Sequence, residues 1–264
     1  MQTAIDPRKL DALQKIRERA LQQLAQRPPE EVAAAAEKHR LRNRILFDFP
    51  DSGPLRRELY PRQMDFFASS AEHTELCFVA SNRCGKSRAA ADGVAYHMTG
   101  MYPHWWVGRR FNKPSVWWTA NESWKRVRDV NQLELLGAPD REDLQGTGAI
   151  PFHLLHRPVP NPHIKFGIES FQVRHVSGGL SSCQFKTYEQ GWKEFEGSKI
   201  DGIWLDEQCP EEIYTACKMR IAATDGSKNS RNGIIFLTFT PLEGLTPLLM
   251  RLKERAVNAD TLGW

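Results

Sequence analysis

A short apolar run stands directly before a glycine-containing loop and the start of a helix. The run Leu76–Ala80 is typical of a buried strand, and residues 81–87 read SNRCGKS before an alanine-rich stretch. This spacing matches the phosphate-loop pattern G-x-x-x-x-G-K-[ST], with Ala80 in place of the first glycine. A strand, a loop of backbone N–H groups and a helix N-terminus in this order form a concave anion site. The feature therefore predicts an α/β fold that binds a nucleoside triphosphate.

The chemistry of the loop residues predicts their roles. Gly85 lets the chain approach the phosphates, Lys86 reaches the β- and γ-phosphate oxygens, and the Ser87 hydroxyl can ligate Mg²⁺. Arg83 could stabilise charge on the γ-phosphate, or it could clamp a neighbouring acidic loop. The residues expected to bind the nucleotide from this loop are Ser81, Asn82, Arg83, Cys84, Gly85, Lys86 and Ser87.

A second motif consists of the apolar run 203–205 followed by Asp206 and Glu207. Paired with a phosphate loop, such a strand delivers one carboxylate to the Mg²⁺ shell, and we assign this role to Asp206. Glu207 is then placed to hold an attacking water and accept its proton. Kinases do not need a water-activating glutamate here, so the pair favours hydrolysis of the nucleotide. An exposed acidic turn is the alternative, and it fits poorly with the apolar residues before it.

A third motif is Leu237-Thr238-Phe239-Thr240-Pro241, at the end of the β-rich run 234–238. We expect this strand to lie beside the phosphate-loop strand. Either Thr238 or Thr240 would then come within hydrogen-bond reach of the γ-phosphate and act as a sensor.

An upstream segment contains a glutamine among aromatic residues. The Gln63 amide can pair with the N6/N7 edge of adenine, and Tyr60 or Phe66 can stack on the base, which favours ATP over GTP. A helix start with buried aromatic residues explains the segment equally well.

The remaining pattern indicates one sheet with covering helices. Strands are expected at 76–80, 115–119, 203–205 and 234–238, and a hairpin at 171–176 and 182–187 around Gly178-Gly179. With 41% hydrophobic residues, no apolar run of membrane-spanning length and no signal peptide, the chain is expected to be cytoplasmic. Five cysteines without metal-type spacing argue against a disulfide framework or a zinc site.

Charged residues are unevenly distributed along the chain. Ten basic and six acidic residues fall in residues 1–45, whereas residues 46–264 hold 26 of each. We therefore expect a basic helical arm over 1–45 and a second domain over 46–264. The arm is expected to form two helices, the first beginning at Asp6-Pro7, separated by Arg27-Pro28-Pro29. The basic run 39–44 is interpreted as a solvated helix end, with nucleic-acid contact as the alternative. The first helix carries an apolar stripe of Leu10, Leu13, Ile16, Ala20, Leu21 and Leu24.

The motifs, in this order, resemble the N-terminal ATPase region of the large terminase subunit of tailed bacteriophages, the motor that pumps DNA into capsids. The resemblance covers roughly residues 55–250. It also rests on residues 102–111, 146–151 and 188–197. It implies a P-loop NTPase of the catalytic-glutamate (ASCE, RecA-like) type that uses ATP and Mg²⁺. It assigns catalysis to Glu207 and Lys86, metal binding to Ser87 and Asp206, and coupling of hydrolysis to movement to Thr238 and Thr240. Arg83 is added as a catalytic candidate because of its position in the loop.

The same resemblance implies partners. These are double-stranded DNA, the portal of a procapsid, the small terminase subunit and further copies in a ring, within the host cell cytoplasm; no membrane is involved, and the isolated chain could be a monomer. Arg109 and Arg110, among aromatic residues, are weaker candidates for DNA contact. Such motors often need a neighbour's arginine, for which Arg126, Arg128 and Arg174 are available.

Two expectations limit the function. Family members normally continue into a nuclease domain of RNase H-like fold, which a chain stopping at Trp264 is too short to hold. A truncated chain and a split subunit both fit, and nuclease activity is not expected. The alternative functions are another nucleic-acid-dependent ATPase, such as a helicase, and a scaffold that binds ATP and barely hydrolyses it.

Overall fold

The chain divides into two compact units, residues 1–41 and residues 42–264. A computed structural model describes residues 7–141, 144–197, 199–221, 233–241, 244 and 246–258. Arg44 and Ile45, which the charge count groups with the arm, belong to the second unit. Ile45 is only 1% exposed there, in the main hydrophobic cluster. The physical edge of the second unit therefore lies just before Arg42.

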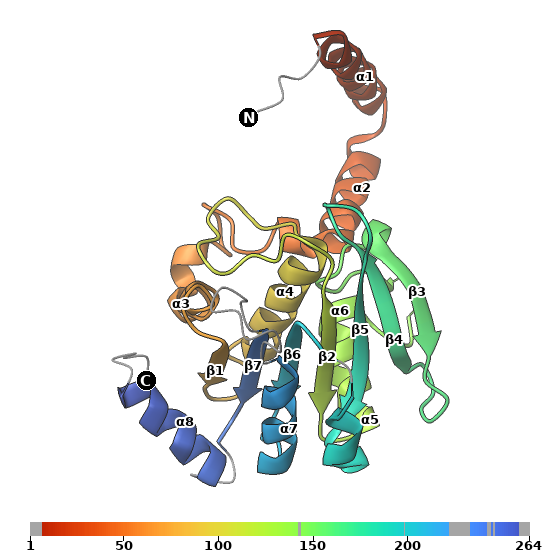
Figure 1. Ribbon diagram of the computed structural model, residues 1–264. Helices are drawn as coiled ribbons and strands as arrows, with labels where there is room; N and C mark the ends of the chain where they lie inside the picture. Colours follow the sequence, from red (N-terminus) through yellow and green to blue (C-terminus); the bar gives the residue numbers. More distant parts are fainter. Residues whose placement is uncertain are drawn as a thin grey trace. The chain divides into compact units, whose positions relative to one another are not determined.

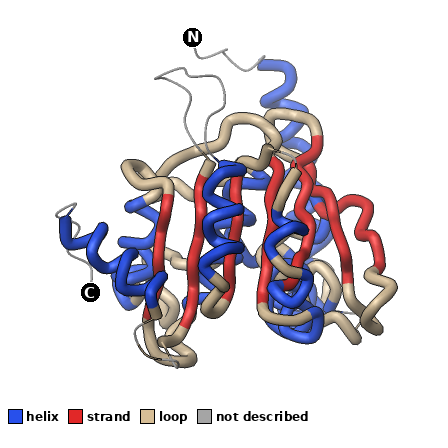
Figure 2. The backbone as a smooth tube through the Cα atoms, turned by 60° about the horizontal axis from the view of Figure 1, so that its bottom comes forward, coloured by secondary structure: helices blue, strands red, loops and turns tan. Residues whose placement is uncertain are grey.

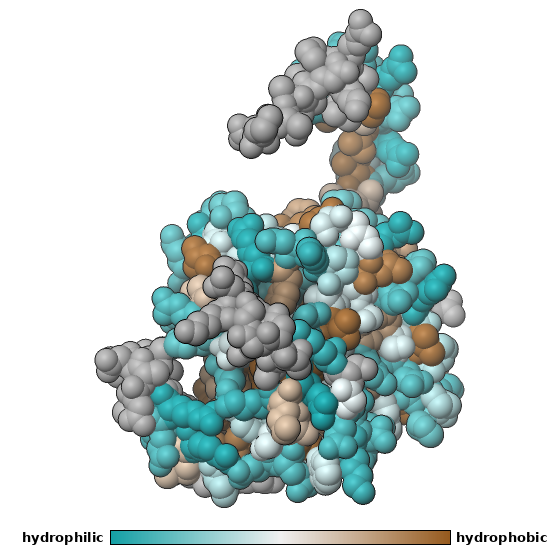
Figure 3. Space-filling view, in the orientation of Figure 1, coloured by the Kyte–Doolittle hydropathy of each residue, from teal (hydrophilic) through white to brown (hydrophobic). Residues whose placement is uncertain are grey.

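The first unit is helical. Helix α1 (Pro7–Ala25) is followed by α2 (Pro29–Arg42), whose first turn holds Glu30 and Glu31. Proline suits the first position of a helix because its missing N–H has no partner there. Ile16, Leu21 and Leu24 of α1 are exposed. Figure 3 shows apolar side chains at the surface of this unit. Asp6 and the side chains of Leu10 and Leu13 lie outside the described part of the chain.

The second unit contains a seven-stranded sheet in the order β1-β7-β6-β2-β5-β4-β3 (Figure 1). The first five strands in this order are parallel neighbours, and β5-β4-β3 is an antiparallel extension. β7 lies between the phosphate-loop strand β1 and the acidic strand β6, so the expected neighbourhood of the first and third motifs is confirmed. The strands are β1 (Glu75–Val79), β2 (Val116–Asn121), β3 (Leu155–Pro160), β4 (Ile168–Arg174), β5 (Leu180–Thr187), β6 (Gly202–Asp206) and β7 (Ile234–Phe239).

Helices cover both faces of the sheet (Figure 2). On one face the hydrophobic cluster joins the sheet to α3 (Pro61–Ser69), α4 (Lys86–Thr99) and α6 (Leu133–Leu136). On the other face a second hydrophobic cluster joins the sheet to α7 (Glu211–Ile221) and α8 (Pro247–Asn258). The α/β fold with a mostly parallel, helix-flanked sheet is thus confirmed. The short helix α5 (Trp124–Arg126) and the π-helical segment η3 (Val127–Gln132) lead into α6.

Side chains of the central strands alternate between two buried faces, which explains why apolar residues follow one another in their sequences. In β7, Phe236 packs in the first cluster, whereas Ile235 and Leu237 pack in the second. In β2, Trp117 and Trp118 are divided between the two faces in the same way, so both tryptophans serve packing as expected. Strands buried on both faces read as continuous hydrophobic runs.

None of the helices in the described ranges is long and apolar enough to cross a membrane. All five cysteines are free thiols.

Candidate functional site

The phosphate loop lies at the edge of the sheet where the parallel strands end, between β1 and α4. Two of its residues have left-handed backbone angles, Arg83 with φ 65° and Gly85 with φ 82°. A Cβ at position 85 would also lie 3.3 Å from the Gln63 amide nitrogen, so glycine is required there. Ala80 is not among the described residues with positive φ, which explains why alanine replaces the first glycine of the pattern.

The Lys86 side chain connects the loop to the residue that follows β7. Its side chain is nearly buried, and Nζ donates to the Ser81 carbonyl oxygen and to Thr240 Oγ1, each at 2.9 Å. Thr240 in turn donates to Asn82 Oδ1 at 2.8 Å. Thr240 follows β7, so the pairing of β1 with β7 brings residues 81–86 and 240 together. An ammonium group held by neutral acceptors at a loop of N–H groups is available to phosphate oxygens.

The structure separates the two threonines, which the sequence left as equal candidates. Thr238 is fully buried, donates to Asp206 Oδ1 at 2.6 Å and accepts a hydrogen bond from Trp204 Nε1 at 2.7 Å. Its hydroxyl proton is therefore committed to Asp206. Thr240 contacts the phosphate loop, and the sensor role is now proposed for Thr240.

Ser87 and Asp206 meet across the site, with Ser87 Oγ donating to Asp206 Oδ1 at 3.0 Å. Burial raises the pKa of the Asp206 carboxyl to about 7, with the Thr238 hydrogen bond opposing this rise and the Glu207 charge adding to it. A hydroxyl and a carboxylate oxygen this close together are the hard oxygen ligands that Mg²⁺ prefers. The two residues therefore fit the expected metal.

Glu207 has an unusual backbone. Its φ is 65°, and its N–H donates to the Thr238 carbonyl oxygen at 2.7 Å. A left-handed conformation costs a residue with a Cβ about 1–2 kcal/mol. Such strain persists where the surroundings hold it, commonly at functional positions. The half-exposed carboxylate makes no hydrogen bond within the described part of the chain, so it is free to bind water.

The residues proposed to contact the adenine of the nucleotide have different surroundings. Gln63 is buried, and its amide nitrogen donates to the Cys84 carbonyl oxygen at 2.9 Å, so it already supports the phosphate loop. Its pairing with adenine stays a prediction, as does stacking by Tyr60, which packs edge-on against Phe49. The alternative stacking residue, Phe66, is wrong, because it is buried at 6% exposure in the aromatic core.

The arginines considered for charge stabilisation and DNA contact also differ. Arg83 is exposed, and no hydrogen bond is found for it within the described ranges. Arg109 donates to the carbonyl oxygens of His73 and Gly233, and Arg110 donates to the Trp106 carbonyl oxygen while lying over the Tyr102 ring. Both of the latter guanidinium groups thus support the protein's own loops.

The sequence reasoning missed Asn121 at the end of β2. This side chain is fully buried, and its Nδ2 donates to Asp206 Oδ2 at 3.1 Å. The signal was present, because a polar residue follows the apolar run of β2 just as Asp206 ends the run of β6. Tyr188, also buried, donates to the backbone carbonyl oxygen of Asp206 at 2.8 Å.

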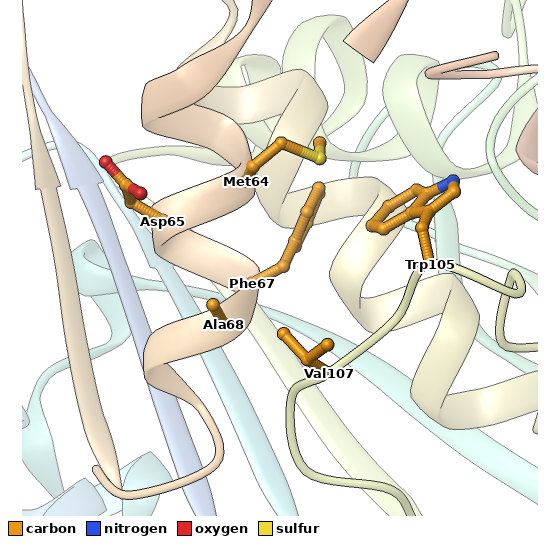
Figure 4. A pocket seen from close by; sticks show the side chains of 6 residues that line it. All are labelled: Met64, Asp65, Phe67, Ala68, Trp105 and Val107. Atoms are coloured by element: carbon orange, nitrogen blue, oxygen red, sulfur yellow. The ribbon is translucent and has the colours of Figure 1, made fainter. Parts of the chain in front are cut away.

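A separate hollow of about 160 Å³ lies beside α3 and contains none of the predicted site residues. In Figure 4, Met64 and Trp105 face each other across it, whereas Asp65 points away. It is too small for a nucleotide. The hollow is lined by Met64, Asp65, Phe67, Ala68, Trp105 and Val107.

Comparison with known proteins gives consistent matches. Residues 77–255 match the family described as terminase large subunit, T4likevirus-type, N-terminal. The terminase large subunit of Salmonella phage P22 is 32% identical over 212 residues, which cover 74% of this chain and 41% of that protein. The chain thus spans well under half the length of this relative.

Two solved structures show more distant likeness. The large terminase of the thermophilic bacteriophage D6E has a TM-score of 0.45 at 12% identity, covering 75% of this chain and 43% of that one. The same protein in complex with ADP has a TM-score of 0.40 at 13% identity, covering 68% and 38%.

Proposed function

The chain belongs to the family of terminase large subunits, and from this premise we propose that it is an ATP-hydrolysing motor domain that translocates double-stranded DNA into a procapsid. The observation that carries the proposal is the convergence of Lys86, Ser87, Asp206 and Glu207 at one edge of the sheet, with Ser87 Oγ 3.0 Å from Asp206 Oδ1. This arrangement joins a phosphate cradle to a metal-binding oxygen pair and a free carboxylate.

The residues divide the work of hydrolysis. The N–H groups of the loop and of the first turn of α4 would bind the phosphates, and Lys86 would exchange its contacts with Ser81 and Thr240 for phosphate oxygens. Ser87 and Asp206 would hold Mg²⁺, which supplies charge neutralisation on the phosphate oxygens when bound. Glu207 would orient the attacking water and accept its proton.

Two further residues would complete the cycle. Exposed Arg83 could reach charge on the γ-phosphate from within the loop. Thr240 bonds both Lys86 and Asn82, so a change in the position of the Lys86 ammonium would reach the end of β7 directly. That contact gives the third motif a route by which hydrolysis could be coupled to movement.

The proposal places the chain in a larger assembly. It would act on double-stranded DNA with a procapsid portal, a small terminase subunit and further copies of itself in a ring, in the host cell cytoplasm. The support is family membership, and the chain spans 41% of its P22 relative. A neighbouring copy in the ring would supply the trans-acting arginine, so an isolated chain is expected to hydrolyse ATP slowly.

Measurements of ATP binding and of ATP hydrolysis distinguish the roles assigned to Lys86 and Glu207. Lys86→Ala should abolish binding of ATP, because the ammonium is the loop's main cation. Glu207→Gln should bind ATP as the wild type does and lose at least about a hundredfold in phosphate release, the usual contribution of a general base. Both are measured with a fluorescent ATP analogue and a phosphate-release assay, with and without duplex DNA.

The matched controls are the exposed residues Lys125 and Glu212, as Lys125→Ala and Glu212→Gln. Normal hydrolysis by the Glu207→Gln variant would remove Glu207 from the role of base. ATP binding without DNA-stimulated turnover in any oligomeric form would favour a nucleotide-binding scaffold. Strand separation without procapsids would favour a helicase.

A further inference from the structure

The two oxygens of the Asp206 carboxylate have different partners. Oδ1 accepts hydrogen bonds from Ser87 and Thr238, whereas Oδ2 accepts one from Asn121 Nδ2. Oδ1 is thus the oxygen beside the phosphate loop, and Oδ2 is turned toward β2. The Asn121 contact distinguishes the two oxygens of a carboxylate that is 1% exposed.

Asn121 itself is held in one orientation. It ends β2, which pairs with β6, and its Oδ1 accepts the backbone N–H of Glu122 at 2.7 Å. Its Nδ2 donates to Asp206 Oδ2 and to Asn131 Oδ1, the latter at 3.0 Å. Both amide hydrogens and the amide oxygen are therefore used. Rotating the amide by half a turn would break all three contacts.

Asn131 is brought to this position by the π-helical segment η3. A π-turn holds about one residue more than an α-turn, and omitting one residue would rotate Asn131 by about 100° around the helix axis. The adjacent Gln132 anchors the segment, because its side chain bonds the Phe166 carbonyl oxygen and the Ile168 N–H. Asn131 is fully buried, and its Nδ2 has no partner within the described part of the chain. The only hydrogen bond of its side chain there is the one that holds Asn121.

We propose that Asn121, held by Asn131 of the π-helical segment, is a positioning residue that presents a single oxygen of Asp206 to the cation beside Ser87. This inference rests on the proposed function. The amide is neutral, so it orients the carboxylate and leaves its negative charge for the cation. A lysine in the same place would compete with the cation instead. Loss of Asn121 would leave Oδ2 buried without a donor and the carboxylate held through Oδ1 alone.

The test measures the requirement for magnesium in the whole 264-residue chain. The readout is the MgCl₂ concentration that gives half-maximal binding of a fluorescent ATP analogue. Asn121→Ala should raise it about tenfold or more, as expected when a residue orienting a metal ligand is removed, and Asn131→Ala should raise it less. The double variant should match Asn121→Ala alone, because Asn131 acts through Asn121.

The control is Asn161→Ala, since Asn161 is also a buried asparagine bonded to a backbone N–H, that of His163, but does not contact Asp206. Thermal unfolding verifies that each variant is folded, and Asn121→Ser replaces Asn121→Ala if the latter does not fold. An unchanged MgCl₂ requirement in a folded Asn121 variant, or fully additive effects of the two substitutions, overturns the proposal. A wild-type chain whose analogue binding is independent of MgCl₂ overturns the proposed function as well, so the two failures are distinguishable.

Discussion

At the scale of single residues, the main electrostatic cost of the site is the burial of the Asp206 carboxylate. The carboxyl is buried beneath the phosphate loop, and its hydrogen bonds come from neutral donors, Ser87, Thr238 and Asn121. Neutral donors orient a carboxylate without neutralising it, so burial dominates and raises its pKa to about 7. A bound cation would remove this cost. The nucleotide-free protein is therefore expected to keep a carboxylate that is destabilising when ionised.

This raised pKa predicts a pH dependence of stability. The folded-state pKa of Asp206 is about 7 against an ordinary 3.8, so the folded protein binds more protons between these values. The free energy of unfolding of the wild type should fall, relative to Asp206→Asn, as pH rises through this window. The slope is at most about 1.4 kcal/mol per pH unit.

Urea unfolding from pH 5 to 7.5, without nucleotide or MgCl₂, measures the difference between the two proteins. Asp65→Asn, at an exposed carboxylate, serves as the control and should show no such trend. A wild-type-minus-Asp206→Asn difference that stays constant with pH would contradict the raised pKa.

At the scale of elements, an ionic cluster ties the start of the second unit to the phosphate-loop helix. Arg44, 11% exposed, contacts Asp92 of α4 at 3.0 Å and Glu134 of α6 at 3.1 Å. Asp48 approaches Arg44 and accepts two hydrogen bonds from Arg88, the residue after Ser87. Arg88 also approaches Asp92 at 3.9 Å. The segment after α2 is thereby bound to the first turns of α4.

Breaking this cluster should destabilise the second unit strongly. Arg44→Met would leave the fully buried Asp92 without its nearest cation, at a cost of about 3–5 kcal/mol. Arg44→Met combined with Asp92→Leu should recover much of that loss, because no buried charge is then unpaired. Chemical denaturation followed by tryptophan fluorescence measures both variants.

An exposed ion pair provides the comparison. Arg126 and Glu122 of the same unit are 62% and 55% exposed, so Arg126→Met should cost less than about 1 kcal/mol. If Arg44→Met cost no more than Arg126→Met, the cluster would not be a structural clamp.

At the scale of the whole molecule, the structure changes the meaning of the charge count. Within the compact unit 1–41 there are eight basic and six acidic residues, so part of the excess assigned to the arm belongs to the second unit. Arg44, one of the transferred cations, is neutralised by the carboxylates around it. The arm is therefore only mildly basic, and its contribution to DNA binding is expected to be modest.

Deletion of residues 1–41 tests this contribution. Salt-dependent binding of duplex DNA should weaken, and the slope of log K against log salt should become shallower by about 2, the change expected when two phosphate contacts of about 0.9 each are lost. The deletion stops before Arg42 because Arg44 and Ile45 pack in the second unit. Fluorescence anisotropy at several salt concentrations measures the slope, and unfolding confirms that the remaining unit is folded. Unchanged affinity and slope would exclude the arm from DNA binding.

The elements that sequence reasoning predicted share one property, which is that local pattern determines them. β6 and β7 were predicted because each contains an uninterrupted apolar run, residues 203–205 and 234–237, as burial on both sheet faces favours. Helix α4 was predicted because an alanine-rich stretch directly follows the loop motif. The edge strand β3 was not predicted, because it is half exposed, irregularly paired and contains two prolines.

The sequence by itself determined the phosphate loop, the acidic strand end and the α/β class, since each depends on residues close together in the chain. Only the tertiary structure decided that Thr238 serves Asp206, that Thr240 faces Lys86, that Phe66 belongs to the core and that Asn121 completes the site. These outcomes depend on which strands are neighbours and on which face each side chain lies. Strand order and burial arise from contacts between distant segments, and no local pattern of residue types specifies them.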